Sequence, residues 1–283
     1  MDFKNYLVPG KTGLLIGIGG VSMSPLAEVL HDAGLDIRGS DMAESSNTLT
    51  LRERGIPIHI GHSADNVTDD ISFVIRTAAV HDDNPEVHEA HRRGIPVFER
   101  TQAWGALMRG YQNALCISGT HGKTTTTSMC THIMMAAEKD PTVMIGGTLP
   151  LLKACHRVGK GNTIIMESCE YYNSFLALNP TIAVVLNIEA DHLDFFKDLE
   201  DIKHSFRCFA ERVPAETGTV IANYDDANTM DALRGIARKV ITFGLNAKAD
   251  VYAQNIVHRG SVSEFDIYHR GNYFARVTLH VPG

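Results

Sequence analysis

Short apolar segments alternate with helical segments through the first hundred residues of the chain. Gly13 to Ile18 (GLLIGI) has the composition of a buried strand, and Ser24 to Ala33 has the pattern of a helix that ends at Gly34. Strands that alternate with helices predict a doubly wound, parallel sheet of the α/β class. The other strands expected here are 35–41, 56–60, 71–77 and 95–98, with helices at 49–54 and 85–93.

The same alternation begins again after residue 110, and 283 residues exceed the usual size of one domain. From Asp250 onward the pattern changes to alternating residues separated by glycine turns, which predicts a β-hairpin or small meander. We therefore expect a Rossmann-like domain at 1–110 and a second α/β domain at 111–283. Its expected strands are 114–118, 162–167, 182–187, 219–222 and 240–243, with helices at 123–137, 199–212 and 226–236.

Composition excludes several classes of protein. The net charge is -7 and no block of Lys or Arg occurs, whereas non-specific nucleic-acid or membrane-surface binding needs a basic footprint. The five cysteines form no Cys-x-x-Cys pair, which favours reduced thiols over a disulfide framework or a zinc site. No stretch approaches the ~20 apolar residues of a membrane span. The sequence thus predicts a soluble, cytoplasmic protein that binds neither nucleic acid nor membranes; it leaves the oligomeric state open.

The segment from Ser118 to Thr124 (SGTHGKT) lies between a predicted strand and a predicted helix. A phosphate-binding loop needs small residues so that backbone N–H groups can surround phosphate oxygens. It also needs a lysine for the phosphate charge and a hydroxyl for Mg²⁺, and Lys123 and Thr124 meet these needs. Ile117 stands where the usual spacing has a glycine, so this loop is a shortened variant. We expect the second domain to be a P-loop-type ATPase domain that binds ATP and Mg²⁺.

Two further candidates follow later strands. Glu167 ends the strand at 162–167, and Asp191 and His192 lie just beyond the strand at 182–187. The carboxyl ends of parallel strands share one edge, where ligands bind, and the loop before Lys123 lies on that edge. We therefore expect Glu167 and His192 to complete the magnesium site begun by Thr124, although imidazole is a less usual ligand for Mg²⁺.

The glycines of the first domain form a weaker signal. Gly17, Gly19 and Gly20 follow a strand and precede a helix, as a dinucleotide-binding loop does, but Ser22 stands where the third glycine belongs. Asp41, at the end of the next strand, is placed to bind a ribose hydroxyl. This loop fits NAD, FAD or the diphosphate of a UDP-sugar, and a purely structural turn stays open.

The chain resembles the Mur ligase family over essentially its whole length. The motifs that carry the resemblance are GIGGVSMSPLAEVL (17–30), GSD (39–41), TAAVHDDNPEV (77–87), SGTHGKTTTT (118–127), IGG (145–147), MESCEYYNSF (166–175) and NIEADHLDFF (187–196). The resemblance implies an N-terminal domain that binds UDP-N-acetylmuramate and a central domain that binds ATP. It implies ATP-dependent joining of L-alanine to the muramyl carboxylate through an acyl phosphate, in peptidoglycan precursor synthesis.

The resemblance also implies roles for single residues. Lys123, Glu167 and His192 are the candidate catalytic residues, and Thr124, Glu167 and His192 the candidate magnesium ligands. The candidate ATP-phosphate residues are Gly119, Thr120, His121, Gly122, Lys123, Thr124 and Thr125. The candidate UDP-sugar residues are Gly17, Gly19, Gly20, Ser40, Asp41, Thr77 and Ala78.

Two departures from the family pattern bear on function. Cys169 stands where many relatives have a carboxylate, which argues against a metal role for that position. The sequence ends where relatives continue into an adenine-contacting helix and a third domain, so we expect a fragment that binds UDP-N-acetylmuramate with negligible turnover. The alternatives are a ligase that joins a whole peptide to the same sugar, a non-catalytic nucleotide-binding module and an NAD-dependent oxidoreductase.

Overall fold

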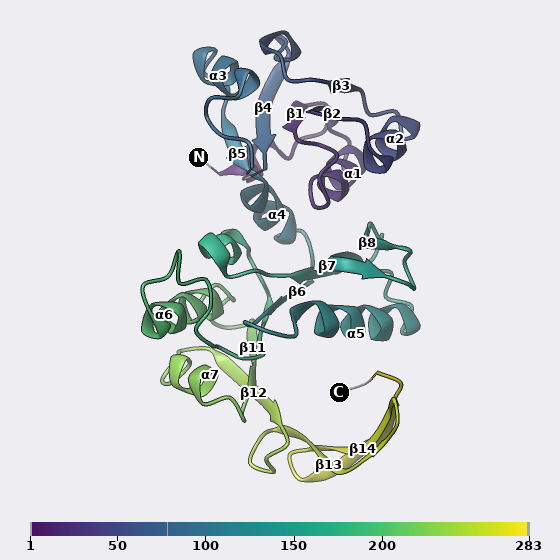
Figure 1. The fold of residues 1–283 in the computed structure, drawn as a ribbon, viewed down its shortest axis with the longest axis vertical. Coiled ribbons are helices and arrows are strands. Elements are labelled where there is room, and N and C mark those ends of the chain that lie inside the picture. Colours follow the sequence, from purple (N-terminus) through teal and green to yellow (C-terminus); the bar gives the residue numbers. More distant parts are fainter. Residues whose placement is uncertain (1, 78, 282–283) are drawn as a thin grey trace. The chain divides into compact units, whose positions relative to one another are not determined.

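The computed structural model describes residues 2–77 and 79–281. Contacts within the chain divide it into two compact units. The first comprises Met1–Gln112, Ser128–Ile165 and Ala177–Asn179, and the second comprises Asn113–Thr127, Met166–Leu176 and Pro180–Gly283. Each unit contains its own candidate site. Figure 1 shows the chain coloured from the N-terminus to the C-terminus.

The first unit contains a five-stranded parallel sheet in the order β3-β2-β1-β4-β5. The order runs outward from β1 in both directions, so right-handed crossovers put α1 and α2 on one face and α3 on the other. This is the doubly wound arrangement that the sequence predicts. The strands are β1 Thr12–Ile16, β2 Asp36–Asp41, β3 Ile58–Ile60, β4 Ile71–Arg76 and β5 Val97–Glu99. The helices are α1 Ser24–Asp32, α2 Ser46–Glu53, α3 Pro85–Arg92 and α4 Arg100–Met108, with short 3-10 helices η1 Phe3–Tyr6 and η2 Ala64–Asn66.

The alternation of side chains along β1 explains why this sheet needs helices on both faces. All five residues of β1 are buried. Leu14 and Ile16 pack in one cluster with Val87 and Ala90 of α3. Successive side chains of a strand point to opposite faces, so Leu15, which is fully buried, needs cover on the other face.

The second unit contains a parallel set of strands, β6-β10-β11-β12, that continues into an antiparallel meander, β13-β14-β15. Figure 1 shows β13 and β14 side by side in yellow. The strands are β6 Asn113–Ser118, β10 Ile182–Val185, β11 Thr219–Asn223, β12 Lys239–Gly244, β13 Val251–Arg259, β14 Val262–His269 and β15 Asn272–Leu279. The helices that follow β6, β10 and β11 are α5 Lys123–Ala136, α6 Leu199–Ala210 and α7 Ala227–Ala232, and η3 Tyr171–Ala177 follows β9 Thr163–Glu167.

The structure differs from the predicted elements in several places, including the following two. An antiparallel pair of strands, β7 Thr142–Leu149 and β8 Ala154–Arg157, was not predicted, because β7 contains two glycines and β8 has no alternating pattern. Helix α7 is also shorter than the predicted 226–236, since Gly235 takes a left-handed backbone conformation (φ 69°). Across 2–77 and 79–281, the helices are all too short or too polar to traverse a lipid bilayer.

Candidate functional site

The loop between β6 and α5 has a shape that only glycine allows at its first position. Gly119 has φ 144°, and a Cβ there would lie 2.9 Å from the Cβ of Leu186 and 3.2 Å from the backbone nitrogen of Asn187. The segment after β10 therefore lies directly against this loop. At its other end the loop becomes helix α5 at Lys123, and the free N–H groups of a helix N-terminus favour phosphate.

Asn187 fixes the middle of the loop. Its side-chain carbonyl accepts a hydrogen bond from the His121 N–H at 2.8 Å, and its side-chain NH₂ donates to the His121 carbonyl at 3.1 Å. The Thr120 N–H donates to the Asn187 carbonyl at 3.1 Å, and the Thr120 hydroxyl accepts from the Glu189 N–H at 2.9 Å. These four bonds attach the phosphate loop to the end of β10.

Lys123 turns its side chain back onto the loop. Its ammonium donates to the carbonyl of Gly119 at 2.6 Å and to the carbonyl of Thr120 at 3.1 Å. It also contacts both carboxylate oxygens of Glu170, at 3.2 and 3.4 Å. The Glu170 side chain is only 3% exposed, so its charge depends on partners within the protein.

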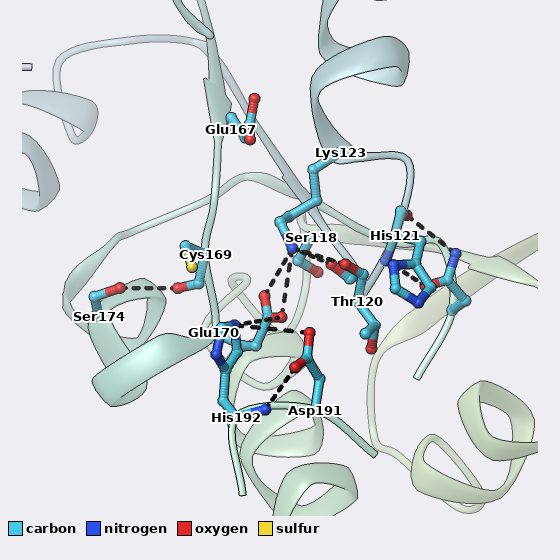
Figure 2. A network of polar contacts seen from close by, with 12 residues as sticks. Ser118, Thr120, His121, Lys123, Glu167, Cys169, Glu170, Ser174, Asp191 and His192 are labelled. Atoms are coloured by element: carbon cyan, nitrogen blue, oxygen red, sulfur yellow. Dashed lines mark hydrogen bonds and ion pairs between the residues drawn. The ribbon is translucent and has the colours of Figure 1, made fainter. Parts of the chain in front are cut away.

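His192 lies on the other side of the Glu170 carboxylate. The His192 Nε2 atom is 3.9 Å from a Glu170 oxygen and 3.9 Å from Asp191, whose carboxylate accepts the His192 N–H at 2.7 Å. In Figure 2 the Glu170 carboxylate appears between Lys123 and the His192 ring. The ring is stacked on Tyr171, with centroids 4.3 Å apart and planes at 24°.

Thr124 and Glu167 are brought together as a pair of oxygen ligands. The Thr124 hydroxyl, exposed in the first turn of α5, donates to the half-buried Glu167 at the end of β9, at 3.0 Å. Hydroxyl and carboxylate oxygens suit Mg²⁺, which takes its other ligands from phosphate and water, so this pair fits the predicted cation. His192 contacts Glu170 and Asp191 instead, and Figure 2 shows Glu167 well apart from His192. Among the described residues no three His, Cys, Asp or Glu side chains gather as a metal site.

The backbone around this site is strained. Tyr172, Asn173 and His192 have φ of 53°, 54° and 51°, a left-handed conformation that asparagine tolerates and that bulky residues rarely adopt. Next to them, the Tyr171 hydroxyl donates to Asp194 at 2.5 Å, and this bond raises the pKa of Tyr171 above its ordinary value. His192 and two residues of η3 thus carry backbone strain.

Cys169 is exposed beside Glu167, although desolvation by the surrounding protein raises the pKa of its thiol. A thiol held neutral is a poor ligand for a hard cation. Thr125, the remaining predicted residue of this loop, is exposed in the first turn of α5.

The glycine loop of the first unit joins the ends of three strands. The N–H groups of Gly17 and Ile18 donate to the Ser40 carbonyl at 2.8 and 3.0 Å, and the Gly19 N–H donates to Asp41 at 2.8 Å. Gly17 has φ 77°, and a Cβ there would lie 2.6 Å from the Thr77 methyl group. Gly17, Gly19, Ser40, Asp41 and Thr77 are thus neighbours, and Gly20 continues the loop through a bond from its N–H to the Gly17 carbonyl. Ala78 lies outside the described residues.

Ser40 is fully buried, and its hydroxyl faces the interior. It donates to Glu86 at 2.7 Å, and Glu86 also contacts His62 at 2.8 Å and accepts from Asn66 at 2.6 Å. The Ser40 backbone, rather than its hydroxyl, therefore contacts the glycine loop. One oxygen of the Asp41 carboxylate accepts the Gly19 N–H of this loop, so the predicted contact with a ribose hydroxyl would have to share this carboxylate with the loop.

The structure adds four polar residues that the sequence did not single out. Arg100 donates to the Ser22 hydroxyl, and Asn47 donates to the Gly19 carbonyl at 2.8 Å, so both fix the first glycine loop. Asn187 and Glu170 fix the second. Glu170 and Asn187 lie within the family-like segments 166–175 and 187–196, whereas nothing in the sequence distinguishes Asn47 or Arg100 from surface polar residues.

Two family models match the chain. "Mur ligase family, catalytic domain" matches residues 15–112, and "Mur ligase middle domain" matches residues 117–283. The second alone covers more than half of the sequence and includes the whole phosphate loop. The chain belongs to the Mur ligase family.

Particular relatives and solved structures are also similar. A UDP-N-acetylmuramate–L-alanine ligase of Agathobacter rectalis is 45% identical over 269 residues, which cover 95% of this chain and 58% of the relative. The crystal structure of UDP-N-acetylmuramate–alanine ligase from Thermotoga maritima matches with a TM-score of 0.77 at 29% identity, over 96% of this chain and 61% of that one. A UDP-N-acetylmuramate:L-alanyl-γ-D-glutamyl-meso-diaminopimelate ligase from Neisseria meningitides shares the fold, with a TM-score of 0.83 at 24% identity over 97% of this chain and 89% of that one. The chain spans about 58% of the length of the Agathobacter relative.

Proposed function

We propose that this chain carries the UDP-sugar and ATP sites of an enzyme that joins L-alanine to UDP-N-acetylmuramate. The observation that carries the proposal is the cluster of Lys123, Thr124 and Glu167 at one loop, in a chain 45% identical over most of its length to such a ligase. The division into a UDP-sugar domain at 1–110 and an ATP domain at 111–283 is part of the proposal. The bounds of the two family matches, 15–112 and 117–283, support it.

The residues of the phosphate loop can bind and orient ATP. The N–H groups of Thr120 and His121 donate to Asn187, so the N-terminus of α5 is the part of the loop that favours phosphate oxygens, and Lys123 supplies a positive charge. Thr124 and Glu167 would hold Mg²⁺, which when bound neutralises negative charge on the transferred phosphoryl group. We assign His192 to the same site from the opposite side of Glu170, where its ring lies apart from the Thr124–Glu167 pair (Figure 2).

The reaction proposed is carboxylate activation followed by amide formation. The muramyl carboxylate attacks the γ-phosphorus of ATP, which forms an acyl phosphate and releases ADP. The amine of L-alanine then attacks the acyl carbon, and inorganic phosphate leaves as the amide forms. Such a reaction depends mainly on positioning and on stabilising developing charge, which suits a site built from backbone N–H groups and one lysine.

Ligand binding tests the proposal directly. Isothermal titration of the chain with UDP-N-acetylmuramate, with ATP and Mg²⁺, and with NAD should show binding of the first two. Titration in the presence of both ligands, with L-alanine or with an L-alanyl peptide added, tests which amine is accepted. Binding of NAD without UDP-N-acetylmuramate would contradict the proposal and favour an oxidoreductase.

We also place the protein in the cytoplasm, where UDP-activated sugars and ATP are available. The lack of any bilayer-spanning helix among the described residues is consistent with that placement. Fractionation of the native host tests it, because the protein should be recovered with the soluble fraction.

A further inference from the structure

We propose that Glu170 is a positioning residue for the phosphate loop. The Glu170 carboxylate holds the Lys123 ammonium in a resting position, and when ATP binds, the ammonium contacts both this carboxylate and the phosphates. The inference rests on the proposed function of this loop as an ATP site. It gives Glu170 a role distinct from those of Thr124 and Glu167. It also predicts that removing the Glu170 charge makes ATP bind more tightly.

The Lys123 ammonium has three protons to donate. In this structure they face the carbonyls of Gly119 and Thr120 and the carboxylate of Glu170, at 2.6, 3.1 and 3.2 Å. All three donors are therefore engaged, and a phosphate oxygen can bind Lys123 only if one of these contacts is given up.

Burial decides which of the three contacts stays. The Glu170 side chain is 3% exposed, whereas Lys123 is 14% exposed and His192 is 32% exposed. A carboxylate that water cannot reach is strongly destabilised when its cationic partner leaves. The loop carbonyls are neutral, so losing their contact with the Lys123 ammonium costs less free energy. We therefore expect Lys123 to keep Glu170 behind it and to exchange loop carbonyls for phosphate.

The Glu170 charge then acts on the affinity for ATP. If Glu170 stays beside Lys123, its negative charge also lies near the phosphates and opposes their binding. The same carboxylate lies 3.9 Å from the Nε2 atom of His192 and so stands between the Lys123 ammonium and the imidazole ring (Figure 2). Glu170 thus weakens the binding of ATP while it fixes the direction from which Lys123 approaches.

The test is the affinity of Glu170→Gln for ATP and Mg²⁺, measured by isothermal titration. The amide keeps the shape and still accepts a bond from Lys123 but removes the charge. We expect ATP to bind about three- to tenfold more tightly than in the wild type, as for the loss of one like charge near the ligand. Glu170→Asp keeps the charge and should bind no more tightly than the wild type. Tighter binding is the opposite of what general damage to the fold produces.

The matched control is Glu189→Gln. Glu189 carries the same charge beside the same loop, 3.6 Å from His121, but its side chain is 59% exposed. Solvent screens that charge, so the affinity for ATP should change less than about twofold. An equal gain in both variants, or weaker binding by Glu170→Gln, would overturn the proposal.

A second measurement separates this inference from the proposed function. Lys123→Ala leaves the Glu170 carboxylate buried without its cation, so the melting temperature of Lys123→Ala should rise when Glu170→Gln is added. If the wild type binds no ATP but the double variant melts at a higher temperature than Lys123→Ala, the ATP assignment fails and the pairing of Lys123 with Glu170 stands. If the double variant melts no higher than Lys123→Ala, the pairing itself is wrong.

Discussion

At the scale of single residues, the phosphate loop depends on neighbouring side chains with different chemical roles in the first turn of α5. Lys123 supplies charge, and Thr124 supplies an oxygen to the neighbouring carboxylate of Glu167. The two residues are adjacent in sequence but point to different partners. Substituting each one alone should therefore change a different property of nucleotide binding.

Lys123→Ala should weaken the binding of ATP and Mg²⁺ by about 10- to 100-fold, because hydrogen bonds to charged groups are worth about 1.5–3 kcal/mol. UDP-N-acetylmuramate should bind as in the wild type, since its proposed loop lies in the other unit. Isothermal titration of both ligands measures this. Equal ATP affinity in the two proteins would remove the phosphate-loop assignment.

Thr124→Val should remove the effect of Mg²⁺ on ATP binding while leaving the binding of ATP without the metal nearly unchanged. Valine keeps the shape of threonine but offers no oxygen to the cation and no proton to Glu167. Titrations with Mg²⁺ and with a chelator give the comparison, and Thr126→Val in the same helix is the control. If Thr124→Val retained the full effect of Mg²⁺, the metal would have to be held elsewhere.

At the scale of elements, the sequence predicted the strands and helices that carry the loops, and it predicted which strand ends would lie side by side. The phosphate loop could be predicted because residues 118–124 contain two glycines followed by lysine and threonine, directly after an apolar strand, which is typical of such a loop. It could not predict Asn187 or Glu170 as partners, since long-range hydrogen bonds leave no local pattern. The β7–β8 pair was missed for the related reason that its pairing depends on tertiary contacts rather than on alternation.

Helix α3 has a charge cluster whose contribution to stability depends on pH. Hydrogen bonds from Arg92 and Arg93 lower the pKa of Glu89 from 4.5 to about 2. Because the folded pKa is the lower one, the stabilisation is complete above about pH 4.5 and is lost as the pH falls through about 2. Melting temperatures of the wild type and Glu89→Gln should therefore differ by a constant amount from pH 7 to 5 and converge toward pH 2. A difference that did not vary with pH would show that Glu89 acts by packing alone.

The loop between β1 and α1 should be sensitive to one methyl group. A Cβ at Gly19 would lie 2.8 Å from the Thr48 methyl group and 3.0 Å from Asp41 and Ser45. Gly19→Ala should therefore displace the loop and weaken UDP-N-acetylmuramate binding by tenfold or more, at about 1.4 kcal/mol per tenfold, without changing ATP affinity. Gly55→Ala is the control, since its Cβ would meet nothing within 4 Å and only its φ of 85° is strained. Loss of ATP binding with UDP-N-acetylmuramate binding kept would reverse the assignment of the two loops.

At the scale of the whole molecule, the domain boundary can be tested by proteolysis. The predicted boundary near residue 110 falls between α4 and β6, where Arg109, Gly110 and Gln112 are exposed. The contacts within the chain give a different division, because they group Ser128–Ile165 with the first 112 residues. Limited trypsin digestion should cut after Arg109 and leave two resistant products, 1–109 and 110–283. Mass spectrometry identifies them. A resistant product that contained the first 112 residues together with 128–165 would favour the division that the contacts give.

The left-handed backbone at Tyr172, Asn173 and His192 has a consequence for engineering. A bulky residue in this conformation costs about 1–3 kcal/mol, and glycine adopts it freely. A screen for heat resistance should thus find Tyr172→Gly and His192→Gly among the gains, although glycine adds disorder to the unfolded chain and reduces the benefit. Those substitutions would remove the ring against which Phe195 packs and the imidazole beside Glu170. Selection for thermal stability without ligand would therefore remove two side chains of this site.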